Sequence, residues 1–166
     1  MSEMKVAVKE GDVFLIPIDA ERAAGGQVID AWSDELYVAV FDGVVAPGFQ
    51  DAAAIVNSEP IFLTLTLDAK LWHGDWPVIG NIQESRRRVP QPMFKVRHSG
   101  QIYVESRDRA VFRPASEREA TELRYRTVSS PAVIDEAVKA HFGVGDWNLN
   151  YGDLRSDYAS SSSKMN

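Results

Sequence analysis

The 166-residue chain has no cysteine and only three histidines. Without cysteine there are no disulfide bonds, no thiolate nucleophile, and no zinc or iron–sulfur site built on thiolates. His73, His98 and His141 are isolated from one another in the sequence, and no pair has the spacing of a metal-binding motif. We therefore expect no metal site.

Common catalytic motifs are also absent. The chain lacks the Gly-x-Ser-x-Gly elbow, the phosphate-binding Gly-x4-Gly-Lys loop and the Gly-x-Gly-x-x-Gly fingerprint. Their absence lowers the odds of common hydrolase, nucleotide-binding and dehydrogenase chemistry. The triplet His73-Gly74-Asp75 places an imidazole near a carboxylate, but a structural or exposed histidine is the more common outcome. We expect no catalytic residue, and a binding protein rather than an enzyme.

The chain has neither a long apolar run nor a basic surplus. No run approaches the roughly 20 residues of a membrane-spanning helix, and residues 1–5 show no basic segment followed by an apolar one. A cytoplasmic protein without a membrane partner is expected. The net charge of −6 opposes nucleic-acid binding and would suit a basic protein partner, although solubility is the more common explanation of such a surplus. The basic run Arg86–Arg88 is more typical of solvated cations than of an anion site.

Apolar patterns predict a β-rich chain. The continuous run 13–18 is typical of a strand that is covered on both faces, and Pro17 places the end of that strand at an edge or a bulge. Residues 61–67 alternate between two faces of a strand. Hairpins are predicted at residues 27–41 and 94–105, because each range holds two apolar runs around a short polar turn.

One helix is clearly predicted, over residues 131–142. Ser130 is a suitable N-cap, Pro131 a suitable first residue, and Gly143 a stop. Residues 122–128 alternate like an edge strand, which would permit pairing of two copies, so we expect a monomer or a weak homodimer.

The predicted fold class is α+β with β predominating: a strongly bent antiparallel sheet or partial barrel with one C-terminal helix. We expect one globular domain over residues 1–154. The serine-rich residues 155–166 are expected to form a flexible C-terminal tail.

The stretch 71–80 is a highly restricted corner of the chain. Trp76-Pro77 enters a short strand, because proline pushes the residue before it toward extended geometry. Each buried indole removes about 150–250 Å² from water and still requires a partner for its N–H group. Trp72 and Trp76 are therefore interpreted as core residues rather than as a site for stacking a ligand.

Three motifs together resemble the immunity protein 26 family of bacterial polymorphic toxin systems. They are the run 11–18, the Gly-Gln-Val strand at 26–28, and the Trp-Pro-Val-Ile-Gly corner at 76–80. The resemblance extends in order over residues 9–143. The residues that we interpret as its structural motif are Gly11, Asp12, Phe14, Pro17, Trp76, Pro77, Ile79 and Gly80.

The resemblance implies a cytoplasmic inhibitor that binds a cognate protein toxin without a cofactor. Some family members carry the description phosphotriesterase HocA, so a phosphotriesterase-like hydrolase is the alternative, and a peptide- or protein-binding adaptor is a third. The motifs resemble core and turn elements and transfer no contact residue. Acids around the first hairpin suit a basic partner, although solvated acids also gather at strand ends. The candidate contacts are Asp30, Asp34, Glu35, Asp42, Asp51 and Glu59.

Overall fold

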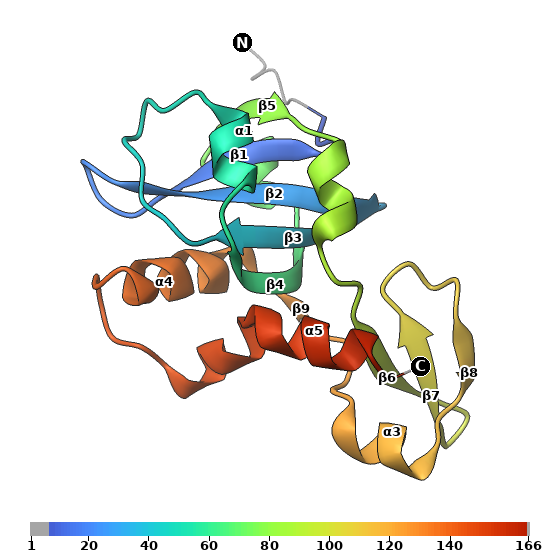
Figure 1. Cartoon of the computed structure of the whole chain (residues 1–166). Helices are drawn as coiled ribbons and strands as arrows, with labels where there is room; N and C mark the ends of the chain where they lie inside the picture. Colours follow the sequence, from blue (N-terminus) through green and yellow to red (C-terminus); the bar gives the residue numbers. More distant parts are fainter. Residues whose placement is uncertain (1–6, 166) are drawn as a thin grey trace. The chain divides into compact units, whose positions relative to one another are not determined.

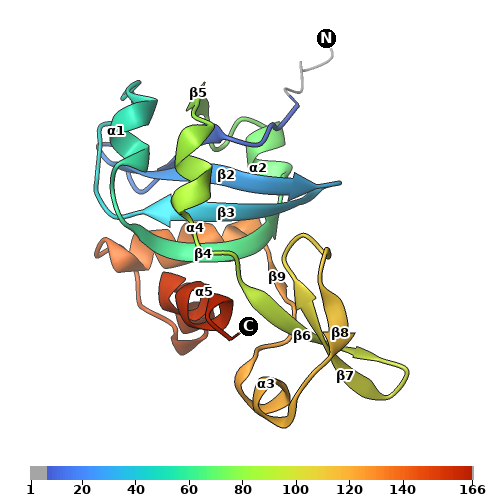
Figure 2. The same ribbon diagram turned by 45° about the vertical axis from the view of Figure 1, so that its right-hand side comes forward.

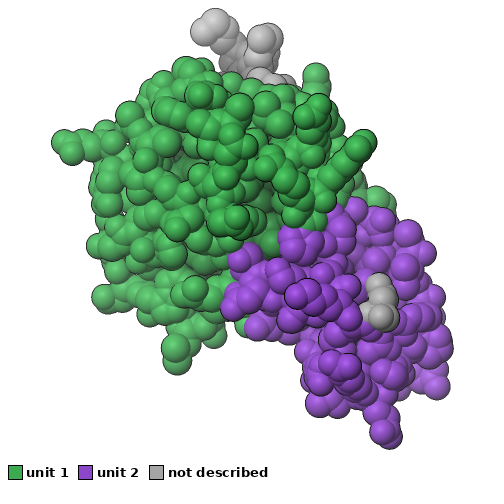
Figure 3. All heavy atoms as spheres, viewed as in Figure 1, with its two compact units in different colours: residues 1–89, 128–155 green, residues 90–127, 156–166 purple. Residues whose placement is uncertain are grey.

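The computed structural model describes residues 7–165, which form two compact units (Figure 3). Unit 1 takes residues 1–89 and 128–155, and unit 2 takes residues 90–127 and 156–166, so the chain leaves unit 1 and returns to it. The single domain expected over residues 1–154 stays a prediction. No helix within the described residues is long and apolar enough to cross a membrane. Residues 1–5, where we expect no leader, lie outside the described part.

Unit 1 is built on an open six-stranded sheet with the order β5-β1-β2-β3-β4-β9 (Figure 1). Neighbouring strands are antiparallel except β4 and β9, which are parallel. The α+β class with β predominating is confirmed, and the sheet does not close into a barrel. The strands are β1 (Asp12–Pro17), β2 (Ala23–Trp32), β3 (Glu35–Phe41), β4 (Pro60–Leu67), β5 (Val78–Asn81) and β9 (Val128–Ser129).

Both faces of the central strands are covered, as the continuous run 13–18 predicts. Residues 13–16 of β1 are all buried. Side chains of α4 (Pro131–His141) join the core cluster on one face, together with Phe14. Helix α1 (Ala52–Val56) packs on the other face, where Ile55 lies against Gly25 (Figure 2). The hairpin predicted at 27–41 is confirmed by the pairing of β2 with β3.

The three family motifs meet in the core of unit 1. The rings of Phe14 and Trp76 stack with centroids 5.3 Å apart and an interplanar angle of 6°. A Cβ atom on Gly26 would lie 2.6 Å from the Phe14 ring, so glycine is required for the ring to rest on β2. Trp76 is 1% exposed, and its Nε1 donates to Asp135 Oδ1 of α4 over 2.7 Å. The core role predicted for Trp76 is confirmed, whereas Trp72 is 37% exposed.

The remaining motif residues shape the edge where β5 joins the sheet. Asp12 accepts hydrogen bonds from Lys9 N at 2.9 Å and from Asn81 Nδ2 at 3.0 Å, which ties the first turn to β5. Pro77 O accepts from Leu15 N at 3.0 Å.

Four further motif positions follow the same edge. Gly11 has φ +92°, a conformation that favours glycine. Pro17 ends β1 beyond the residues that pair with β5, as its missing N–H predicts. Ile79 is half-buried in β5, and a Cβ on Gly80 would lie 2.9 Å from Ala52 Cβ.

The helix predicted at residues 131–142 is confirmed as α4, which begins after its N-cap Ser130 and ends at His141. The expectation of one helix is incomplete, because short helices occur elsewhere among the described residues. Their capping and packing depend on contacts that an apolar stripe does not reveal. They are α1, α2 (Ala69–Trp72), η1 (Glu84–Arg88), α3 (Glu117–Glu122), η2 (Leu149–Leu154) and α5 (Ser156–Ser163).

Unit 2 contains a three-stranded antiparallel sheet of β6 (Met93–His98), β7 (Gln101–Ser106) and β8 (Phe112–Pro114), together with α3 and α5. The second predicted hairpin is confirmed by the pairing of β6 with β7. The strand predicted at residues 122–128 is wrong except at Val128, where β9 begins. A capping box starts α3, which runs to Glu122, and an isolated parallel bridge joins Tyr125 to Lys95.

The serine-rich segment expected to be a flexible tail forms α5 in the described structure. Tyr158 Oη donates to Met93 O at 2.7 Å, and Ser162 Oγ accepts from Met93 N at 3.2 Å. Ala159 and Ser162 are each 1% exposed. Small side chains let the helix lie close to β6. Flexibility stays a prediction, since contacts do not measure motion, and Asn166 lies outside the described residues.

A pH dependence follows from the fork between Arg113 and Glu119 in unit 2. The two guanidinium nitrogens lie 2.8 and 2.7 Å from the Glu119 carboxylate, and Ser116 N donates to it as well. These bonds lower the pKa of Glu119 from 4.5 to about 2. The carboxylate therefore stabilises unit 2 above pH 4.5, and this contribution is lost as the pH falls toward 2.

Glu119→Gln should remove that pH-dependent stability. We expect the two proteins to differ in urea stability above pH 4.5, and the difference to shrink as the pH falls toward 2. The readout is the NMR signal of α3 amides, because all four tryptophans lie in unit 1. Glu122→Gln is the control, since its ion pair with Arg118 is exposed. A difference that is independent of pH would contradict the assignment.

Candidate partner-binding surface

The structure separates the six candidate acids into two groups at opposite ends of β3. Asp34 and Glu35 lie where β3 begins, with Asp30 on the adjoining end of β2. Asp42 follows the end of β3, and its N–H donates to Glu59 O at 2.8 Å. A seven-residue strand spans roughly 20 Å. The six acids therefore do not form one patch.

The first group is partly committed to structure. Arg86 Nη2 lies 2.8 Å from Asp30 Oδ1 and also pairs with Glu10, while Arg86 Nε donates to Ile29 O at 2.5 Å. The side chain of Asp30 is 17% exposed. The interpretation of Arg86 as a solvated cation is wrong, because its guanidinium ties η1 to β2. Asp34 is exposed in the turn, and Glu35 is half-buried.

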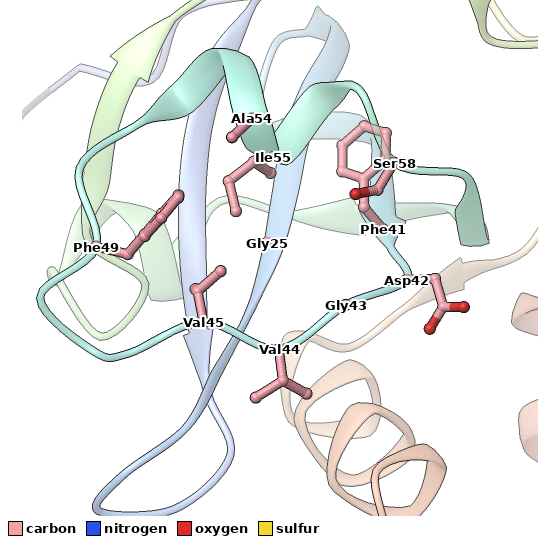
Figure 4. Close-up of a pocket in the computed structure, with 10 residues that line it drawn as sticks. All are labelled: Gly25, Phe41, Asp42, Gly43, Val44, Val45, Phe49, Ala54, Ile55 and Ser58. Atoms are coloured by element: carbon pink, nitrogen blue, oxygen red, sulfur yellow. The ribbon is translucent and has the colours of Figure 1, made fainter.

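The second group adjoins a pocket of about 180 Å³ (Figure 4). The pocket lies between the segment that follows β3 and the helix α1, over Gly25 of β2. Most of its lining residues are of apolar type, although their backbone adds polar surface, and Asp42 is the only charged residue among the ten drawn. The lining residues are Gly25, Phe41, Asp42, Gly43, Val44, Val45, Phe49, Ala54, Ile55 and Ser58.

Backbone contacts hold the pocket walls in place. Val45 exchanges two hydrogen bonds with Ala23, at 2.8 and 2.9 Å, which fixes the segment after β3 against β2. Asp51 caps α1 by accepting from Ala54 N at 3.2 Å. A Cβ on Gly25 would clash with Ile55, so the glycine lets α1 lie close to the sheet. These contacts form the pocket from the chain's own residues, and it does not require a partner to shape it.

Asp42 is the acidic residue among those that line the pocket, and it is open to solvent. The side chain of Asp42 is 62% exposed, and its Oδ1 lies 3.7 Å from His141 Nε2, which is longer than a hydrogen bond. Asp51 and Glu59 are exposed. Sequence reasoning nominated all three acids but missed the apolar walls. The apolar residues Val44, Val45 and Phe49 were visible in the sequence, but their segment has no regular periodicity, so it predicted no packed wall.

The histidines do not come together. His73 is exposed after α2, His98 packs edge-on against Tyr103 and Phe112 in unit 2, and His141 packs edge-on against Phe62. Within residues 7–165 no group of three or more His, Asp or Glu side chains has the arrangement of a metal site.

Comparisons with known proteins place the chain by its sequence. Neither the curated proteins nor the solved structures gave a match. A family model described as Immunity protein 26 matches residues 9–102, which is more than half of the chain. The matched span contains all three motifs that meet around Phe14 and the whole pocket beside Asp42. The chain belongs to the immunity protein 26 family.

Proposed function

We propose that the protein binds a cognate bacterial protein toxin in the cytoplasm and neutralises it, acting as a monomer or weak homodimer without a cofactor, nucleic acid or membrane. The observation that carries the proposal is the family match over residues 9–102. Inhibition of this kind requires a stable surface rather than a reactive group. Binding then prevents the toxin from reaching its substrate.

The distribution of charge supports a basic partner. Unit 1 carries nine Lys and Arg residues against eighteen Asp and Glu, whereas unit 2 carries nine against six. The acidic surplus of the chain therefore resides in unit 1, which also holds the six candidate acids. An acidic surface attracts a basic partner during encounter and raises the association rate.

The proposal is tested by expressing the protein together with the product of a neighbouring gene and following growth. We expect the neighbour to be toxic alone, the pair to be tolerated, and the two proteins to co-elute in a fixed ratio. A pull-down from host lysate at low and moderate salt extends the search to other genes. If no specific partner appears in either experiment, the proposal fails, and bound metal and esterase activity become the measurements of interest.

Reversing two charges at the β2–β3 turn tests the first group of acids. Asp34→Lys with Glu35→Lys should slow association with a basic toxin about tenfold at low salt, because the steering field is weakened. Stopped-flow association kinetics measure the rate. The control is Glu136→Lys with Asp146→Lys, which changes the net charge equally at exposed positions elsewhere in unit 1. Equal slowing in both would assign the effect to net charge alone and remove the turn from the interface.

A further inference from the structure

We propose that the pocket beside Asp42 receives one arginine side chain of the toxin. The inference rests on the proposed function and selects one of the two acidic groups as the place where affinity is set. Binding energy at protein interfaces is concentrated in a few anchors that fill pockets. This pocket is preformed and lies in the acidic unit of the chain.

The dimensions of the pocket suit a single side chain. Its volume of about 180 Å³ is far above the roughly 10–15 Å³ that a cavity needs to hold one water molecule. Val45 points toward Ile55 of α1 across the pocket, and Val44 lies at its outer end with its side chain directed away from α1 (Figure 4). An aliphatic stem lying between Val45 and Ile55 would remove apolar surface from water on both sides.

The charge at the rim favours a cationic end group. The Asp42 carboxylate forms only a long ion-pair contact with His141, at 3.7 Å, and its side chain is 62% exposed, so its oxygens can accept the parallel N–H groups of a guanidinium. Unit 1 as a whole carries a surplus of acidic side chains. Phe49 supplies an aromatic ring in the wall, on which a guanidinium stacks more favourably than an ammonium.

Arginine combines the features that these walls require. Its stem matches apolar walls while its charged end remains near solvent. A leucine or phenylalanine side chain would fill the pocket but would not pair with the Asp42 carboxylate. An acidic side chain would be repelled by that carboxylate. The opposite end of β3 is less suited, because Asp30 is already paired with Arg86.

The first experiment uses the toxin obtained by co-elution and measures its dissociation constant. Val44→Arg should weaken binding about a hundredfold, because it places positive charge at the mouth of the pocket and repels a cationic anchor. Asp42→Asn should weaken binding about tenfold, the effect of losing a charge-assisted hydrogen bond. The control is Val133→Arg on α4, since Val44 and Val133 are similarly exposed, at 43% and 39%. Wild-type affinity in Val44→Arg, or equal loss in Val133→Arg, would overturn the inference.

The second experiment does not require the toxin. Methyl signals of Val44, Val45 and Ala54 are followed by NMR while N-acetyl-arginine N-methylamide is added, with the norleucine and glutamate analogues as controls. We expect shifts with arginine that exceed those with norleucine and that decrease in Asp42→Asn. Absence of this preference would overturn the arginine assignment even if a toxin binds. If the arginine compound binds but no toxin partner is found, the proposed function is refuted. The toxin is then not the source of the arginine side chain.

Discussion

Trp76→Ala is expected to lower the free energy of unfolding of unit 1 by about 3–5 kcal/mol, the range for removing a buried Trp or Phe side chain. Trp76 is 1% exposed and stacks on Phe14. Its removal leaves a cavity and also deprives Asp135 of the indole N–H, so that Lys70 Nζ, 3.2 Å from the other carboxylate oxygen, remains as its ion-pair partner. Since domains are stable by only about 5–15 kcal/mol, the loss is a large share of the total.

Far-UV circular dichroism during urea denaturation measures this change, because tryptophan fluorescence would itself be altered by the substitution. Trp72→Ala is the matched control in the same corner of the chain. Trp72 is 37% exposed, so its removal loses less buried surface and should cost clearly less than the removal of Trp76. Similar losses in the two variants would show that the stack on Phe14 does not determine stability.

The expected effect of Trp76→Ala also explains what the family motifs encode. Phe14, Gly26 and Trp76 come from three separate parts of the chain and meet in one stack. Their spacing in the sequence therefore identifies a fold rather than a binding site. Substitutions in the stack should weaken toxin binding only as far as they unfold unit 1, whereas substitutions in the pocket should weaken binding without loss of stability.

Local patterns were sufficient for elements whose contacts are close in sequence. The β2–β3 hairpin depends on a short turn at Ser33 and Asp34, and α4 on its cap at Ser130 and its stop at Gly143. The capping box of α3, at Ser116 and Glu119, is a signal of the same local kind. Each of these signals acts within a few residues of the element that it defines.

Long-range pairings were not predictable from the same patterns. Nothing near Asp135 in the sequence indicates that it accepts a hydrogen bond from Trp76, 59 positions away. The parallel pairing of β9 with β4 and the pairing of Val45 with Ala23 in the pocket wall were not predictable for the same reason. Each joins residues that are far apart in the sequence. The ion pair between Arg113 and Glu119 joins residues only six positions apart but was not predicted, because a sequence pattern does not show which charged side chains face one another.

Gln27→Leu is expected to lower the stability of unit 1 by about 2–4 kcal/mol, because it leaves two buried polar groups unpaired at about 1–2 kcal/mol each. Gln27 is fully buried in β2. Its Nε2 donates to Ile82 O at 2.7 Å, and its Oε1 accepts from Ser85 Oγ at 3.0 Å. Leucine matches the size of glutamine but makes neither bond. Urea denaturation followed by tryptophan fluorescence measures the loss, and Gln50→Leu at an exposed position is the control.

A second substitution distinguishes lost pairing from poor packing. Gln27→Leu leaves the Ser85 hydroxyl without its hydrogen-bond partner. If this causes the loss of stability, Ser85→Ala should cost less in the Gln27→Leu protein than in the wild type, because it removes the unpaired hydroxyl. A steric origin would make the two losses additive or worse. Sub-additive losses would assign to Gln27 the role of joining η1 to β1 and β2 through its side chain. The Gly-Gln-Val motif would then specify a close ring contact at Gly26 and a buried polar link at Gln27, in adjacent residues that face opposite sides of the sheet.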